Sequence, residues 1–140
     1  MKCKVEQLKQ RKKIKSWIDD VAKSYGYSID HVSYNFVSEE EITSANNQFL
    51  HHNYPTDIIT FDFTISPKIL CADILVCPDV VKRNANELHV SLLEELNRVI
   101  IHGILHLVGF DDANDNDILQ MRNAEDQALI LLHQILSSPE

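Results

Sequence analysis

The segment from Cys71 to Cys77 constrains the fold more than any other, because six of its seven residues are apolar. A short apolar run of this kind is typical of a strand that lies inside a sheet, with a neighbouring strand on each side. Two further strands are therefore needed. Alternating apolar and polar residues predict one of them, half buried, over residues 31–37, and the other is expected within residues 56–65.

Helices are expected between these strands and throughout the second half of the chain. Capping boxes at Ser38 and Ser91 indicate helix starts, Pro78 fits a first helical turn, and Gly26 and Gly109 are natural stops. The expected helices cover residues 8–25, 38–50, 78–89, 92–108 and 118–136. Strands followed by helices predict an α+β fold, in which a small mixed β-sheet packs with helices in one domain over residues 1–140.

Length and composition exclude several classes of protein. The 140 residues are 44% hydrophobic and 24% charged, which suits one globular domain and not a disordered chain. The longest apolar run, residues 99–110, is far shorter than the roughly 20 residues of a membrane span, and the basic N-terminus lacks the apolar core of a signal peptide. Three cysteines without a C-x-x-C pair argue against a disulfide framework and favour a reducing cytoplasm, with Cys71 and Cys77 as free thiols.

The net charge of −8 is unevenly distributed along the chain. Residues 1–23 carry eight of the 13 basic side chains and only three acidic ones, a local charge of +5. The remaining residues are strongly acidic and would repel nucleic acid at long range. Arg11, Lys12 and Lys13 are therefore candidates for contact with phosphate, and a merely solvated helix face is the alternative interpretation.

The segment from His102 to Asp112 carries the clearest chemical pattern. His102 and His106 lie four residues apart, so on one helix they project from the same face and can share one ion. Gly109 lets the chain turn back at the end of that helix, which places Asp112 to approach the same ion. Two core histidines are the alternative, but the glycine turn and the carboxylate favour a metal site. Three protein ligands leave a fourth position for water, as in catalytic zinc sites.

The same spacing occurs in the metzincin peptidases, whose motif is H-E-x-x-H-x-x-G-x-x-H. Gly103 stands where those enzymes carry the glutamate that acts as general base. The spacing of the zinc ligands is therefore the same as in those enzymes, but the residue needed for peptidase chemistry is missing. A metallopeptidase is a remote alternative.

Several motifs together resemble one family. Residues 102–112 resemble H-G-x-L-H-L-x-G-Y-D-H, the signature of the YbeY family of endoribonucleases. Residues 55–61 are similar to that family's P-T-D-V-L-S-F, and residues 72–76 to its G-D-I-x-I. Met121 and Glu125 fit the M-x-x-x-E that follows the histidine motif. The resemblance covers most of the chain from Val32 to Leu132.

The resemblance implies a single α+β domain with one zinc ion, or another transition metal, held by His102, His106 and the residue at position 112. It implies zinc-dependent cleavage of single-stranded RNA in maturation of the 16S rRNA 3′ end and in ribosome quality control. The implied partners are the small ribosomal subunit, and ribosomal proteins or a ribosome-associated GTPase, in the cytoplasm and away from membranes. A non-catalytic, zinc-containing ribosome-assembly factor is the alternative.

Two positions depart from the family pattern. Asp112 replaces the family's third histidine, and a carboxylate there softens the metal selectivity toward iron or manganese. Leu50 stands where many members carry an arginine that is a candidate phosphate clamp. His52, and His51 beside it, either substitute for that arginine or are exposed loop residues.

The remaining candidates lie in two loops. The resemblance places Thr56 and Asp57 beside the cleft, although both residues also suit the start of a strand. The catalytic group itself stays open. The candidates are a zinc-bound water, Asp111 and His52, and Asp111 also fits a simple turn.

Overall fold

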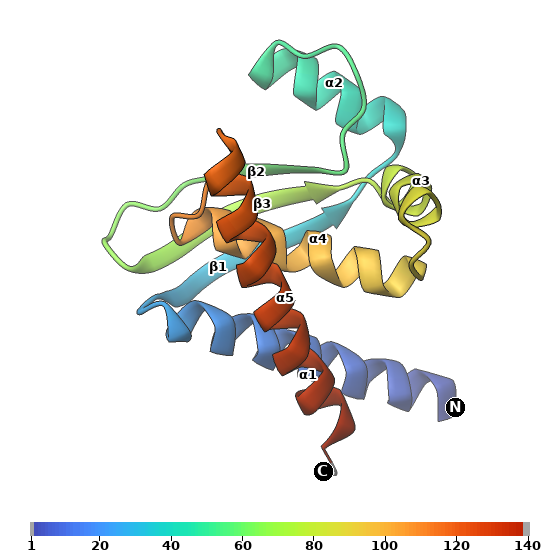
Figure 1. Cartoon of the computed structure of the whole chain (residues 1–140), viewed down its shortest axis with the longest axis vertical. Coiled ribbons are helices and arrows are strands. Elements are labelled where there is room, and N and C mark those ends of the chain that lie inside the picture. The colour runs from blue at the N-terminus through green and yellow to red at the C-terminus, as the bar shows by residue number, and fades with distance from the viewer. Residues whose placement is uncertain (1, 139–140) are drawn as a thin grey trace.

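The computed structural model describes residues 2–138, and side chains from residue 10 onward. These residues form five helices and three strands, and Figure 1 shows how the elements are arranged. Their bounds are α1 Lys2–Ser24, β1 Ser28–Phe36, α2 Glu39–Leu50, β2 Ile58–Asp62, β3 Ile69–Val76, α3 Pro78–Leu88, α4 Leu92–Leu107 and α5 Asp115–Ser137. The predicted α+β class is confirmed. None of the described helices is long and apolar enough to cross a membrane.

The sheet has the order β1-β3-β2, so β3 is its central strand, as its apolar sequence predicts. β1 runs parallel to β3, and β2 runs antiparallel to it, which makes the sheet mixed. Alternate residues of β3 are buried, among them Leu70, Ala72, Ile74 and Val76. These side chains point to the face of the sheet that the main helical layer covers.

The main core lies between the sheet and helices α1, α4 and α5, and α5 crosses both α1 and α4 (Figure 1). The Trp17 indole joins the two terminal helices by donating to the Ala128 carbonyl at 2.7 Å. Tyr34 of β1 donates to the Ile100 carbonyl of α4 at 2.9 Å, and burial raises the pKa of its hydroxyl. The largest fully buried side chains here are those of Trp17, Leu70, Ile101, Ile104, Leu105 and Leu132.

A smaller core covers part of the opposite face. Ile42 of α2, Ile59 of β2, and Cys77 and Val80 near the start of α3 pack together there. Ser38 caps α2 through the predicted capping box. The Ser38 hydroxyl accepts a hydrogen bond from the Glu41 amide, and the Glu41 carboxylate accepts one from the Ser38 amide. Cys77 is buried and Cys71 half buried, and both are free thiols.

Helix α4 lies unusually close to the sheet at Gly103. A Cβ atom there would stand 3.0 Å from Ile74 Cδ1 and 3.2 Å from Ile58 Cδ1. Gly103 is buried and therefore lets the helix approach the sheet closely. This contact fixes the rotation of α4, and with it the direction of the neighbouring His102.

Candidate functional site

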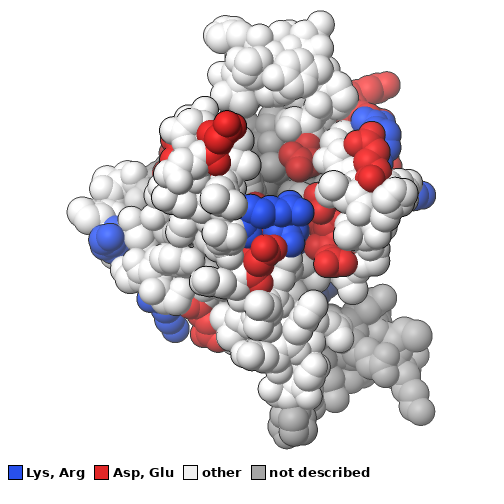
Figure 2. All heavy atoms as spheres, in the orientation of Figure 1, with Lys and Arg blue, Asp and Glu red and all other residues white. Residues whose placement is uncertain are grey.

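A polar cavity of about 270 Å³ is formed by α4, α5 and the loops that precede β2 and α5. Figure 2 shows a basic patch near the middle of this face with acidic side chains around it. The cavity is lined by Asp57, Glu95, Arg98, Val99, His102, Asp112, Arg122 and Glu125. Residues distant in sequence, two of them predicted metal ligands, thus meet in one place.

His102 is held in the cavity wall by Glu125. The His102 Nδ1 lies 2.7 Å from Glu125 Oε2, and because a carboxylate accepts, Nδ1 carries the hydrogen. Nε2 is then the nitrogen left for a ligand. The hydrogen bond with Glu125 raises the pKa of the His102 imidazole, against the opposing effect of burial, and the charges of Asp57 and Asp112 act in the same direction as the bond.

Glu125 is the centre of a buried charge network. Its side chain is 7% exposed, and its Oε1 accepts from Arg98 at 2.9 Å. The second Arg98 nitrogen donates to Asp126 at 2.7 Å. Since a buried carboxylate is costly unless it is paired, these bonds explain how Glu125 can orient His102 from inside the protein. A carboxylate behind a histidine in this way is common in metal sites, where it fixes the ring and raises its basicity.

Glu95 adds a second buried carboxylate to the cavity. Burial raises the pKa of Glu95, and the charge of nearby Asp57 has the same effect. Asp57 lies in the loop before β2 and lines the cavity together with residues of α4, the helix that carries the two histidines. Thr56 does not line the cavity; its hydroxyl lies 3.4 Å from the Asp57 carboxylate.

His106 and Asp112 are more exposed than His102. His106 follows one helical turn later but does not line the cavity. Gly109 has φ +113°, which supplies the predicted turn after α4 and brings Asp112 to the cavity. The Asp112 amide donates to Asp111 Oδ1 at 2.8 Å, so Asp111 acts in the turn.

The three predicted ligands do not meet at one point as they lie. Within residues 2–138, no group of three or more His, Cys, Asp or Glu side chains is placed to hold a metal ion. The chemistry of these three side chains nevertheless suits a metal ion. Nε2 of His102 is available, His106 is exposed on the next turn, and the Asp112 carboxylate borders the same cavity. Binding would require these side chains to converge, and the ligand assignment stays a prediction.

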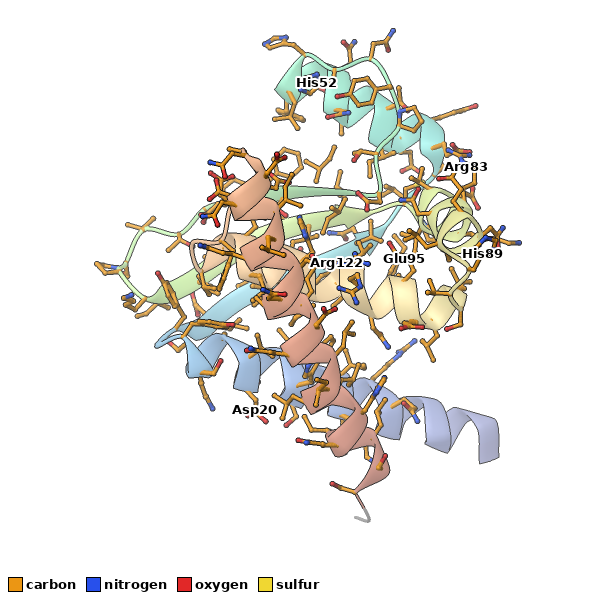
Figure 3. All side chains as sticks on the ribbon, viewed as in Figure 1. Asp20, His52, Arg83, His89, Glu95 and Arg122 are labelled. Atoms are coloured by element: carbon orange, nitrogen blue, oxygen red, sulfur yellow. The ribbon has the colours of Figure 1, made fainter. Side chains whose placement is uncertain are left out.

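Other predicted residues lie away from the cavity. His52 is exposed and lies just beyond the end of α2 (Figure 3). Its ring is tilted against that of Tyr54, with the ring centroids 5.3 Å apart. Leu50 is also exposed and does not line the cavity. Arg11 borders a separate, mainly apolar groove between α1, β1 and α4. Lys12 is exposed, and Lys13 lies 3.4 Å from the Ser138 carbonyl.

Sequence reasoning missed Glu95, Arg98 and Arg122 as cavity residues and used Glu125 only as a motif residue. A usable signal was present, because positions 95, 98 and 102 share one helix face at spacings of three and four. Residues 122 and 125 repeat that spacing on the last helix. Nothing in one sequence, however, indicates that these two faces meet.

An α+β domain with a polar cavity in which a buried carboxylate orients a histidine has an arrangement that hydrolases use. The family model described as Endoribonuclease YbeY matches residues 1–133. The chain is 43% identical over 129 residues to the Endoribonuclease YbeY of Porphyromonas gingivalis, covering 92% of this chain and 85% of the relative. It is 40% identical over 128 residues to that of Bacteroides thetaiotaomicron, covering 91% and 92% of the two chains.

A solved structure agrees with these matches. The solution structure of TM1509 from Thermotoga maritima has a TM-score of 0.65 and 32% identity, covering 89% of this chain and 81% of that one. The chain therefore belongs to the YbeY family of endoribonucleases.

Proposed function

We propose that this chain is a metal-dependent endoribonuclease that cleaves single-stranded RNA during maturation of the small-subunit rRNA. The observation that carries the proposal is the pair of His102 and Glu125 in an acidic cavity, in a chain of this family. We further propose the small ribosomal subunit, and ribosomal proteins or a ribosome-associated GTPase, as its partners, and the cytoplasm as its location.

In this proposal His102, His106 and Asp112 would hold one zinc or other transition-metal ion. The ion, when bound, would supply Lewis-acid stabilisation of charge at the phosphate. Glu125 keeps His102 in one orientation by accepting from Nδ1. Arg98 balances the charge of Glu125, so the carboxylate stays paired inside the protein.

The direct test combines metal analysis of the purified protein with an RNA cleavage assay. We expect about one ion per chain, and cleavage of an unstructured oligoribonucleotide that stops with a chelator and returns with added zinc or manganese. A structured duplex of the same composition is the control substrate and should resist cleavage. Full cleavage in the presence of chelator, or none under any metal, would contradict the proposal.

One observation favours a second candidate, a non-catalytic ribosome-assembly factor that contains zinc. The cavity holds four carboxylates against two arginines, and such a charge does not attract RNA by itself. Ribosome binding without cleavage of any RNA tested would select this candidate.

The third ligand is tested at position 112. Asp112→His is expected to retain or tighten zinc binding, because a neutral imidazole suits zinc well. Asp112→Asn keeps the shape but loses the charge, and should weaken binding by about tenfold or more. Competition titration with a zinc-binding dye measures both. Equal binding by Asp112→Asn and the parent would remove the Asp112 carboxylate from the ligand set.

The basic face of α1 is tested by replacing Arg11, Lys12 and Lys13 together with glutamine. If these residues contact phosphate, RNA or ribosome binding should weaken, and the slope of log affinity against log salt should fall by about 0.7 per lost contact on a single strand. Metal content should not change, since the segment contains no proposed ligand. An unchanged slope would show that the face is only solvated.

A further inference from the structure

The acidic cavity poses an electrostatic problem for a protein that binds RNA. Asp57, Glu95, Asp112 and Glu125 surround it, and the cations on its wall are Arg98 and Arg122. A metal ion offsets part of this charge, but a phosphate that enters must also find donors that are not already engaged by carboxylates. The two arginines differ sharply in this respect.

Arg98 is fully engaged inside the protein. One guanidinium nitrogen donates to Glu125 at 2.9 Å and another to Asp126 at 2.7 Å. Its side chain is only 14% exposed. Moving Arg98 toward a ligand would leave the buried Glu125 without its main cation, so Arg98 is a structural residue.

Arg122 lies on the open side of the same network. Its side chain is 52% exposed, and its Nη1 is 4.0 Å from Glu125 Oε1, too far for a hydrogen bond. No other ion pair or side-chain hydrogen bond involves Arg122 within the described part of the chain. Figure 3 shows it on α5, near Glu95 of α4 across the cavity. Its donors can therefore turn to a ligand at little cost.

Arg122 shares the cavity with two of the predicted metal ligands, His102 and Asp112. Glu125 Oε2 lies 2.7 Å from His102 Nδ1, and Glu125 Oε1 lies 4.0 Å from Arg122 Nη1, so a single carboxylate stands between the two side chains. Both side chains line the same cavity of about 270 Å³, so a phosphate group held in that cavity can meet the Arg122 guanidinium and the His102 side chain together.

We propose that Arg122 binds the RNA phosphate backbone beside the scissile bond and holds it against His102. The inference rests on the proposed function, because it concerns how that substrate is positioned. A guanidinium suits this role, since its planar fork can donate two parallel hydrogen bonds to phosphate oxygens, whereas a lysine ammonium acts as a point charge.

The test compares Arg122→Ala and Arg122→Lys with the parent protein and with Arg83→Ala. Arg83 is similarly exposed, pairs with Glu39 on another part of the surface and does not line the cavity, so Arg83→Ala controls for the loss of one positive charge. Binding of a labelled single-stranded oligoribonucleotide is measured with chelator present, over a range of salt concentrations. Cleavage of the same oligoribonucleotide is measured with added metal.

We expect Arg122→Ala to lower the slope of log affinity against log salt by about 0.7, the loss of one phosphate contact, while Arg83→Ala leaves it unchanged. In the cleavage assay KM should rise about tenfold for Arg122→Ala, and less for Arg122→Lys. The metal content and melting temperature should match those of the parent, which distinguishes a substrate contact from a structural role.

Each failure has a separate meaning. If the parent cleaves RNA and Arg122→Ala matches it in slope and in KM, the inference is wrong while the proposed function stands. If the parent binds the oligoribonucleotide but never cleaves it, the proposed function fails, and the salt slope alone decides whether Arg122 contacts phosphate. If the parent neither binds the oligoribonucleotide nor cleaves it with added metal, both fail.

Discussion

His106→Ala is expected to remove stoichiometric metal and to lower RNA cleavage by about 100-fold or more, because it deletes one of three proposed ligands. His106 is the informative choice, since it is exposed and takes no part in the Glu125 network. The folded structure should therefore persist, and the loss can be assigned to the site. Elemental analysis of the purified variant and the RNA cleavage assay measure the two effects.

His133→Ala is a matched control for His106→Ala. His133 is also an exposed histidine within a helix, and it does not line the cavity. This control variant should keep both the metal and the activity of the parent. Full metal occupancy in His106→Ala would exclude His106 as a ligand and with it the predicted three-residue site.

Gly103→Glu is expected to lower the free energy of unfolding by roughly 3–5 kcal/mol, comparable to leaving a buried charge unpaired. The new side chain would start 3.0 Å from Ile74 Cδ1, on the face of α4 that packs against the sheet. It would point into the core and away from the cavity. Urea denaturation measures the effect, and a chain that fails to fold is the extreme of the same result.

Gly103→Ala is the companion variant. It adds one methyl group against the flexible ends of two isoleucines and gains helix propensity, so its net effect should stay within about 1 kcal/mol. The pair also tests the metallopeptidase alternative. A folded Gly103→Glu variant that cleaved peptides would show that this helix face can present a general base to the metal, which the packing of α4 contradicts.

Local sequence signals predicted most of the fold. The apolar run in β3 identified the central strand, and the cap at Ser38 identified the start of α2. The ends of the two terminal helices were less predictable. α1 begins at Lys2, well before the periodic apolar residues, and α5 begins at Asp115, after an Asn114 cap whose side chain accepts from Asp117. Polar turns at helix ends carry little periodicity, so apolar spacing misses them.

Only the part of the candidate site that lies within one helix was predictable from the sequence. Helical spacing is enough to place His102 and His106 on one helix. The bond between His102 and Glu125 spans 23 residues and depends on how α4 and α5 cross. That crossing is set by packing of the whole core, so the carboxylates and arginines around the histidine cannot be located from the pattern of one sequence.

Helices α4 and α5 both line the polar cavity and both build the main core. Any ligand that binds between them selects the native state over the unfolded one, so its affinity is thermodynamically linked to folding. At a concentration 100 times its dissociation constant, such a ligand adds about 2.7 kcal/mol of stability. Thermal melting in the presence of individual divalent ions, or of short oligoribonucleotides, can therefore rank the natural occupants of the cavity without any assay of catalysis.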